Sequence, residues 1–382
     1  MAMQLMEAST AMFIPTNDKS HNLWCWRLFL AAAFLGALPV AAEPYLAFKT
    51  NNDCSACHIN PTGGGARNTY GSFYGARMLP ATPGSQDVID GGQLTDNVRL
   101  GADLRFNFSY LDQEDTDAAR GFNTDSGQIY VALQPKGSRF SAYFDQQVLP
   151  GGSRTREAFV LAKFDNQRYL KAGNFIVPYG IKLQDDSAFI RQATQINFDS
   201  NDNGIEWGMN HGKLFTQFAV TNGSSSQNND DRQLQYVGRG EYIGGNWRLG
   251  GSYLLNDADA GKRQMVNIFG GFNIADYIFL FEVDSIDDHS ISNVPGENLS
   301  QLVGLLEVNK EISQGVNVKF TSEFLDPDDN IDENERTRHS LLLEYTPYAY
   351  VQLRGGLRIG DDIPQREEGN YTEALVQLHF YY

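Results

Sequence analysis

Short segments of alternating apolar and polar residues fill the chain from Asn97 to its C-terminus. In the first of them, Leu104 and Phe106 alternate with Asp103 and Arg105, and the same pattern returns in residues 316–324 and 351–359. Successive side chains of a β-strand point to opposite faces, so this period of two predicts strands with one apolar and one polar face. A soluble β-sandwich alternates as well, so the alternation alone does not place the strands in a membrane.

The connections between these segments are more informative than the segments. Turns of two or three residues are expected near 135–137, 165–166, 211–212, 244–246, 275–276, 312–313 and 346–347. Longer polar loops are expected near 111–125, 149–154, 175–202, 222–231, 256–262, 284–298, 325–335 and 361–370. Short and long connections alternate strictly, as periplasmic turns and extracellular loops do in even-stranded outer-membrane barrels. The sequence therefore predicts an all-β fold, a transmembrane antiparallel β-barrel of about 16 strands.

Composition supports strands as the membrane-crossing element. Hydrophobic residues make up 41% of the 382 residues, and after residue 45 no apolar stretch approaches the roughly 20 residues that a spanning helix needs. The 37 glycines, 18 tyrosines and 24 phenylalanines suit tight turns and aromatic girdles. A formal charge of -17 argues against a nucleic-acid partner, because a phosphate backbone requires a basic surface.

The N-terminus has the layout of a secretory signal. Arg27 precedes the apolar run 28–40, and small residues at Ala41 and Ala42 indicate cleavage near Ala42. Residues 1–42 are therefore predicted to be a signal peptide for export, and the predicted barrel then places the exported chain in the bacterial outer membrane. Its removal takes Cys25 away and leaves Cys54 and Cys57 as the cysteines of the mature chain.

Those two cysteines belong to the pentapeptide Cys54-Ser55-Ala56-Cys57-His58, which has the C-x-x-C-H spacing of c-type haem attachment. Two thiols at this spacing can form thioethers with the haem vinyl groups, and the following imidazole becomes the proximal iron ligand. The competing interpretations are a structural disulfide and a thioredoxin-like redox pair, whereas a zinc site would lack a fourth soft ligand. We expect one covalent haem c, held by Cys54, Cys57 and His58.

Two features after the motif leave alternatives open. The run Gly63-Gly64-Gly65 either lets the backbone approach a flat macrocycle or is an ordinary turn. Met78, 20 residues after His58, is the candidate for a sixth iron ligand within this segment, and the alternatives are a packing role for Met78 and an open sixth position.

The chain is expected to divide into a signal peptide (1–42), a monohaem cytochrome c segment (43–90) and a porin-like barrel (91–382). About 40 residues rarely fold alone without a staple, so the haem segment is expected to plug or cap the barrel lumen, with inward Arg and Lys side chains near the haem propionates. A segment that hangs free in the periplasm is the alternative. His379 faces inward by strand parity and is expected to line the lumen.

These features resemble the fused cytochrome–porin proteins of bacterial outer membranes, the iron-oxidising outer-membrane cytochrome type. The likeness lies in the signal, in residues 44–50 leading into Cys54-Ser55-Ala56-Cys57-His58, and in the barrel of about 16 strands. Where the iron-oxidising members have further aromatic and basic residues after the motif, this chain has residues 60–65, Asn-Pro-Thr-Gly-Gly-Gly. Residues 172–180 also resemble a segment of ordinary substrate-selective porins.

The resemblance implies an electron conduit between an extracellular donor, such as Fe(II), and periplasmic c-type cytochromes. Acidic loop residues either gather Fe(II) through oxygen ligands or merely solvate the surface; they are Asp112, Glu114, Asp115, Asp117, Asp326, Asp328, Asp329, Asp332 and Glu333. The second hypothesis is a substrate-selective porin with a structural or gating haem plug, and the third is a soluble periplasmic haem sensor. The expected partners are outer-membrane lipid and, as in many porins, further copies of the chain.

Overall fold

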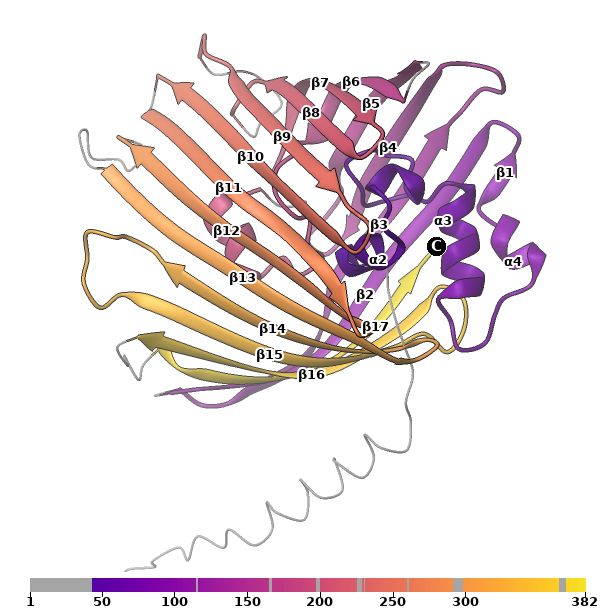
Figure 1. The fold of residues 1–382 in the computed structure, drawn as a ribbon. Coiled ribbons are helices and arrows are strands. Elements are labelled where there is room, and N and C mark those ends of the chain that lie inside the picture. The colour runs from indigo at the N-terminus through magenta and orange to yellow at the C-terminus, as the bar shows by residue number, and fades with distance from the viewer. Residues whose placement is uncertain are drawn as a thin grey trace, which may run out of the picture. The chain divides into compact units, whose positions relative to one another are not determined.

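The alternating segments are β-strands, and β2 to β17 pair in sequence order as a closed antiparallel barrel of 16 strands in the computed structural model (Figure 1). The ring closes where β17 pairs with β2, with Val376 opposite Phe108. The short β1 pairs only with the start of β2. The predicted fold class is confirmed.

The structure describes residues 43–382 except 115, 165–166, 197–199, 225–228, 230, 260, 291–297 and 364–368. The predicted signal peptide, residues 1–42, lies outside the described residues. The described helical elements are α2 (Pro44–Thr50), η1 (Cys54–Ala56), α3 (Thr69–Phe73), the π-helical turn η2 (Tyr74–Met78), α4 (Gln86–Asp90) and α5 (Phe189–Thr194). Among them, none combines the length and the apolar character that a bilayer-crossing helix requires.

The strands include the segments that alternation predicted. They are β1 (Gln93–Thr95), β2 (Val98–Gln113), β3 (Ala119–Leu133), β4 (Phe140–Leu149), β5 (Arg154–Phe164), β6 (Arg168–Ile176), β7 (Asn201–His211), β8 (Leu214–Thr221), β9 (Gln235–Ile243), β10 (Trp247–Ala258), β11 (Gly261–Ile274), β12 (Tyr277–His289), β13 (Asn298–Ser313), β14 (Val316–Asp326), β15 (Glu335–Tyr345), β16 (Val351–Ile363) and β17 (Tyr371–Tyr381).

The two faces of the strands differ as the sequence predicts. On β2, Leu104 and Phe106 point outward and are 42% and 43% exposed, whereas Asp103 and Arg105 point inward and are 7% exposed. An apolar outer wall around a polar interior is the arrangement that a lipid-embedded barrel requires. Some inward charges are paired across strands, as between Lys171 and Glu206, whose Nζ and Oε2 are 2.7 Å apart.

Several strands extend further into the predicted long loops than the pattern suggested. The loop expected at 256–262 is a tight connection, because β10 continues to Ala258 and β11 begins at Gly261. Asp257 lies opposite Lys262 on one face there and Asn256 lies opposite Arg263 on the other, so the strand end is polar on both faces. Alternation disappears where a strand leaves the apolar band, and such residues look like loop in the sequence.

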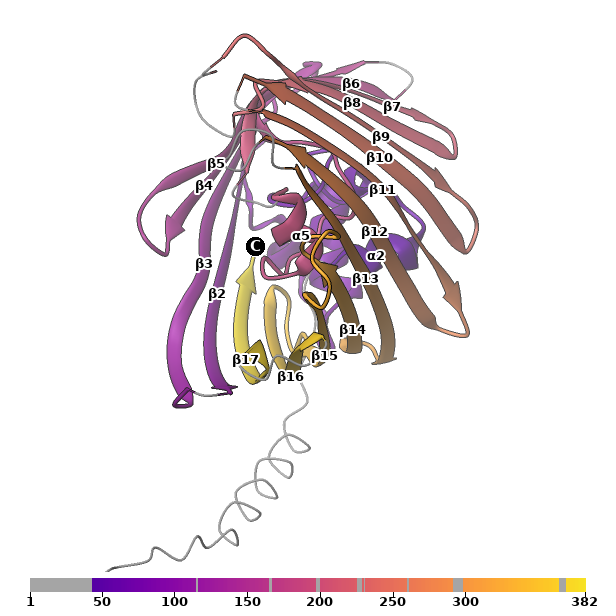
Figure 2. The same cartoon turned by 90° about the vertical axis from the view of Figure 1, so that its left-hand side faces the viewer.

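Two segments occupy the interior of the barrel. The first begins with α2, which contacts β11 and β12, and the second is the connection between β6 and β7, whose helix α5 contacts β12, β13 and β14. Figure 2 shows α2 and α5 inside the ring of strands. Between them they bring residues 43–80 and 177–196 against inward-facing side chains of the wall.

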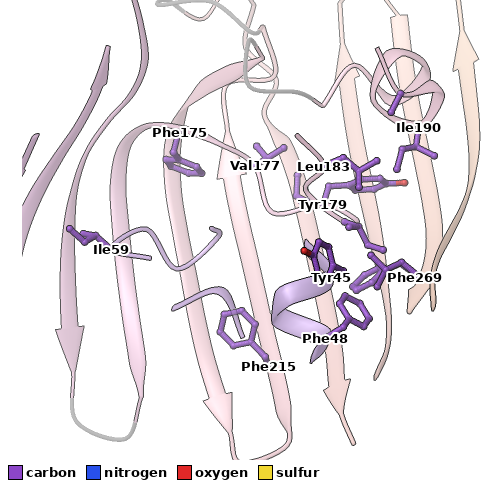
Figure 3. Packing of buried hydrophobic residues seen from close by; sticks show 14 of the residues in the cluster. Tyr45, Phe48, Ile59, Phe175, Val177, Tyr179, Leu183, Ile190, Phe215 and Phe269 are labelled. Atoms are coloured by element: carbon purple, nitrogen blue, oxygen red, sulfur yellow. The ribbon is translucent and has the colours of Figure 1, made fainter. Parts of the chain in front are cut away.

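The start of the first segment is fixed by both apolar packing and charge. Tyr45 and Phe48 on α2 are buried, and Figure 3 shows Phe48 next to Phe269 of β11. Glu43 forms ion pairs with Lys319 of β14, at 2.8 Å, and with Arg354 of β16, at 2.5 Å. These contacts attach residues 43–50 to strands on different parts of the wall.

Candidate functional site

Cys54, Cys57 and His58 are brought together by a single helical turn. The Asp53 carboxylate accepts a hydrogen bond from the Ser55 amide at 2.9 Å and so caps the start of η1. The amide of His58 then donates to the carbonyl of Cys54 at 3.0 Å. Both cysteines are unpaired and half-buried. The turn thus presents two thiols and one imidazole within five residues.

Asn68 fixes this turn from the other side. Its side-chain amide donates to the carbonyls of Ser55 and Ala56 at 3.0 Å each, and its backbone amide donates to the carbonyl of Cys57 at 2.9 Å. The side-chain oxygen of Asn68 also accepts from the amide of Gly71 at 2.9 Å, which caps α3. One asparagine therefore joins the motif to the helix that follows it.

The three consecutive glycines are required by the backbone itself. Gly63, Gly64 and Gly65 all have positive φ angles, of 86°, 79° and 60°, a region that other residues rarely adopt. A Cβ on Gly63 would lie 3.1 Å from the Cys54 sulfur. The run is a tightly packed turn under the motif, which accounts for the glycines without contact to a macrocycle.

The motif is held to the barrel wall by polar side chains from several strands. The Asn60 amide donates to the Glu157 carboxylate of β5 at 2.8 Å, and Lys171 of β6 donates to the Thr62 hydroxyl at 3.0 Å. The further contacts are Asn210 to Asp53, Arg248 to the carbonyl of Asn52, Lys182 to the carbonyl of Gly63, and the amide of Ala66 to the Tyr143 hydroxyl.

A solvent-connected cavity lies between this segment, the barrel wall and the β6–β7 connection. Cys54, Cys57 and His58 line one side of it. The lining also contains basic side chains from the wall and the connection, namely Arg105, Arg156, Lys182, Arg191, Arg239 and Arg248, together with the acidic Asp103, Asp145, Glu157 and Glu241. A pocket with convergent polar groups around a reactive motif is the expected form of a cofactor site.

The environment keeps the imidazole neutral and the thiols protonated. Burial, followed by the positive charges of Arg67 and Lys182, lowers the pKa of His58 to about 3. Burial raises the pKa of the Cys54 thiol, against the opposing charges of Arg239 and Arg248, and burial also raises the pKa of Cys57. Neutral imidazole is the form that binds iron. A thioredoxin-like pair would need a lowered thiol pKa, so the environment disfavours that interpretation.

These residues fit a haem c. The two thiols are not joined in a disulfide, and both face the cavity. His58 lines the same cavity, so its imidazole could ligate an iron held there. Arg67 and Lys182, whose positive charges act on His58, also line the cavity and are suitable partners for propionates.

The other residues considered from the sequence lie elsewhere. Met78 is 54% exposed and is not part of the cavity lining, so the structure does not bring it to Cys54, Cys57 and His58. Its role as sixth ligand stays a prediction that this geometry does not support. His379 points inward as predicted and is fully buried, where its Nε2 lies 2.7 Å from the Asp103 carboxylate.

The acidic loops do not form a metal centre of the usual kind. Within the described residues, no three or more His, Cys, Asp or Glu side chains gather as a possible metal site. Near residues 326–330 the carboxylates accept local hydrogen bonds, as Asp328 does from the Asn330 amide at 3.1 Å. Their arrangement is that of ordinary turn-forming surface acids.

Sequence reasoning missed the residues that hold the motif in place. Strand parity places Glu157, Lys171 and Arg248 inside the barrel, but parity does not say that they contact residues 52–62. The sequence did offer one signal: charged residues occupy inward positions of the strands, and the chain carries a separate segment around Cys54 and His58 that such residues could bind.

Gly71 offers a test of this construction. A Cβ at Gly71 would lie 2.0 Å from the carbonyl oxygen of Cys57, whereas a Cβ at Gly75 would have nothing nearer than 3.6 Å. We expect Gly71→Ala to destabilise the segment by about 1–3 kcal/mol and to reduce haem attachment. Gly75→Ala is the matched control, and haem per chain in the pyridine haemochrome assay is the measurement. Equal haem content in the two variants would contradict this packing.

Neither a protein-family model nor a curated protein sequence matches this chain. Solved structures do match. The anion-selective porin from Comamonas acidovorans is 12% identical with a TM-score of 0.60, and the match covers 75% of this chain and 99% of that one. The DcaP channel of Acinetobacter baumannii is 12% identical with a TM-score of 0.58, over 75% and 97%. OprB of Pseudomonas putida is 10% identical with a TM-score of 0.56, over 81% and 100%. At these identities the likeness shows a shared fold, the barrel of outer-membrane porins.

Proposed function

We propose that this protein is an outer-membrane barrel that binds one haem c covalently inside its lumen and passes electrons between an extracellular donor and periplasmic c-type cytochromes. The observation that carries the proposal is the position of Cys54, Cys57 and His58 on a cavity within a porin-like barrel. A haem c, when bound there, supplies a one-electron redox centre.

The chain's own residues would perform three tasks. Cys54 and Cys57 would hold the cofactor covalently, and the neutral imidazole of His58 would ligate its iron. Asn68, Glu157 and Lys171 would keep the motif rigid relative to the wall. The apolar outer face would contact lipid, so the redox centre would sit within the insulating layer and shorten the gap between donor and acceptor.

The donor and the assembly state are parts of the proposal. Fe(II) is the donor that the likeness to iron-oxidising cytochrome–porins suggests, and the acidic outer loops suit the approach of a hydrated cation. One of the structurally similar barrels, OmpT of Vibrio cholerae, is described as a trimer. We extend the same assembly to this chain.

A second candidate function is a solute porin in which the haem segment is structural or acts as a gate. The barrel fold, which this chain shares with an anion-selective porin, and the basic side chains on its cavity favour this candidate. It predicts a conductance that does not depend on the haem oxidation state. The electron-transfer proposal predicts electron flow without matching solute flow.

Proteoliposomes distinguish the two. Purified protein is reconstituted around an enclosed oxidised cytochrome c, and Fe(II) or another impermeant reductant is added outside under anaerobic conditions. We expect reduction of the enclosed cytochrome with the wild-type protein and only the background rate with the double variant Cys54→Ala, Cys57→Ala. Equal rates for the two proteins would refute the electron conduit, and passage of radiolabelled anions at either oxidation state would favour the porin.

A further inference from the structure

Two carboxylates in the barrel wall lack the charge partner that their neighbours have. Glu282 and Asp284 are successive inward positions on β12 and are 2% and 0% exposed. Elsewhere in the described wall, Glu206 pairs with Lys171, Glu241 with Arg248, and Glu323 with Arg338. Among the residues that the structure describes, no Lys, Arg or His side chain forms an ion pair with Glu282 or Asp284.

The β6–β7 connection covers this pair. The Glu282 carboxylate accepts hydrogen bonds from the amide of Ile181 at 2.5 Å and from the Asn267 side chain at 2.9 Å. A Cβ at Gly180 would lie 2.0 Å from the Glu282 carboxylate, so only glycine lets the backbone pass so close. The connection therefore packs directly on Glu282.

Asp284 is the unusual member of the pair. Both of its carboxylate oxygens are fully buried without a hydrogen bond, and the hydroxyl of Tyr179 is buried in the same condition. The polar groups around Asp284 are Asn267, Tyr179 and Glu282. Figure 3 shows Tyr179 on the interior connection, close to Leu183. A buried carboxylate without compensation costs several kcal/mol, so something else must balance it.

The nearby arginines do not supply that balance, because they are used elsewhere. Arg239 binds Glu241 at 3.1 Å and the carbonyl of Gly180 at 3.2 Å. Arg263 lies 3.3 Å from Asp288 and donates to the carbonyl of Ala193 at 2.7 Å. Neither arginine therefore forms an ion pair with Glu282 or Asp284.

We propose that Glu282, Asp284 and Tyr179 form a binding site for one divalent metal cation. Two carboxylates neutralise a divalent charge, and their oxygens with the phenol oxygen are the ligand types that Mg²⁺, Ca²⁺ and Mn²⁺ prefer. Water completes the shell, as is usual for sites with only two carboxylates. Asn267 is a positioning residue, since it donates to Glu282 and accepts from the Ser252 amide at 2.7 Å.

This site goes beyond the proposed electron transfer and is independent of it. It lies on the wall beside the β6–β7 connection, and none of its three ligands belongs to the haem-binding motif. A chain with Cys54→Ala and Cys57→Ala should bind the cation as the wild type does. If experiments refute the haem proposal, the cation site can still exist. If experiments refute the cation site, the haem proposal is unaffected.

The test uses the full chain, purified in detergent after treatment with a chelator, and Mn²⁺ as the probe. The electron paramagnetic resonance signal of free Mn²⁺ falls as the ion binds. We expect one Mn²⁺ per chain for the wild type and for Asp257→Asn, whose exposed carboxylate on β10 controls for surface binding. Asp284→Asn should weaken binding at least about tenfold, since even residues that only support a ligand cost this much.

A wild-type protein that binds no Mn²⁺, or Asp284→Asn binding as tightly as Asp257→Asn, would overturn the site. The latter outcome would mean that the acids share a proton instead. If Asp284→Asn does not fold, Glu282→Gln and Tyr179→Phe are measured in its place, because each keeps the shape of the side chain. The same tenfold criterion applies to Glu282→Gln.

Discussion

Replacing both Cys54 and Cys57 with alanine is expected to remove all covalently bound haem from this protein. The thioethers formed by these two sulfurs are the only such covalent link that residues 43–382 can offer, because this range contains no other cysteine. His58 alone would leave a cofactor that is lost on denaturation. The measurement is peroxidase staining of the denatured protein on a gel, with wild-type protein beside the double variant.

The single variants are expected to give a result between those of the wild type and the double variant. Cys54→Ala and Cys57→Ala each leave one thioether, so a weaker stained band is expected for each of them, and Ser55→Ala is the control within the same turn. The barrel of the double variant should still form, because Cys54 and Cys57 share no disulfide and its strand ladder lies outside the motif. Circular dichroism and the heat-dependent gel shift of β-barrels check this.

A stained band in the double variant would refute covalent attachment at this motif. An unstained wild-type protein would refute it as well. If, in addition, the intact mass of the wild type fell by two hydrogens, the motif would be a structural disulfide. The three interpretations of the pentapeptide therefore give three different results in one set of samples.

The barrel was predictable from the sequence because its rule is local. A residue such as Leu104 faces lipid because of its position in a strand, whatever lies across the barrel. The alternation of short turns and long loops then fixes an even number of antiparallel strands. Only the strand ends were misjudged, as at Asp257, where polar residues cover both faces.

The interior was less predictable because its contacts are long-range. Parity shows that Lys171 faces inward, but its partners, Glu206 and Thr62, are 35 and 109 residues away in sequence. The likeness of residues 172–180 to a porin segment did not show that the following residues cover Glu282. Such pairings depend on how the whole barrel closes, which no single stretch of sequence encodes.

Met78 ends a helical turn whose geometry the sequence does not predict. The amide of Leu79 donates to the carbonyl of Tyr74 at 3.0 Å, five residues back, so this turn is wider than an α-helical turn. The extra residue changes the direction in which later side chains point. Met78 is 54% exposed at the end of this turn. The spacing of 20 residues between His58 and Met78 does not predict this wider turn.

Deleting residues 43–83 is expected to convert the barrel into an open, water-filled channel. A barrel of about 16 strands has a lumen wide enough for water and small solutes once nothing occupies it. The deleted segment binds Glu157, Lys171, Lys319 and Arg354 from inside. Without it these charges face water, which solvates them, so the wall does not keep unpaired buried charges.

We expect the single-channel conductance in planar bilayers to rise about tenfold or more on this deletion, because the lumen changes from filled to open. The full-length double variant Cys54→Ala, Cys57→Ala is the matched control, since it retains the segment and lacks covalently bound haem. A rise confined to the deletion would show that the polypeptide closes the lumen. A similar rise in the double variant would instead assign closure to the cofactor. An unchanged conductance in the deletion would mean that residues 43–83 are not the barrier, leaving the β6–β7 connection to close the pore.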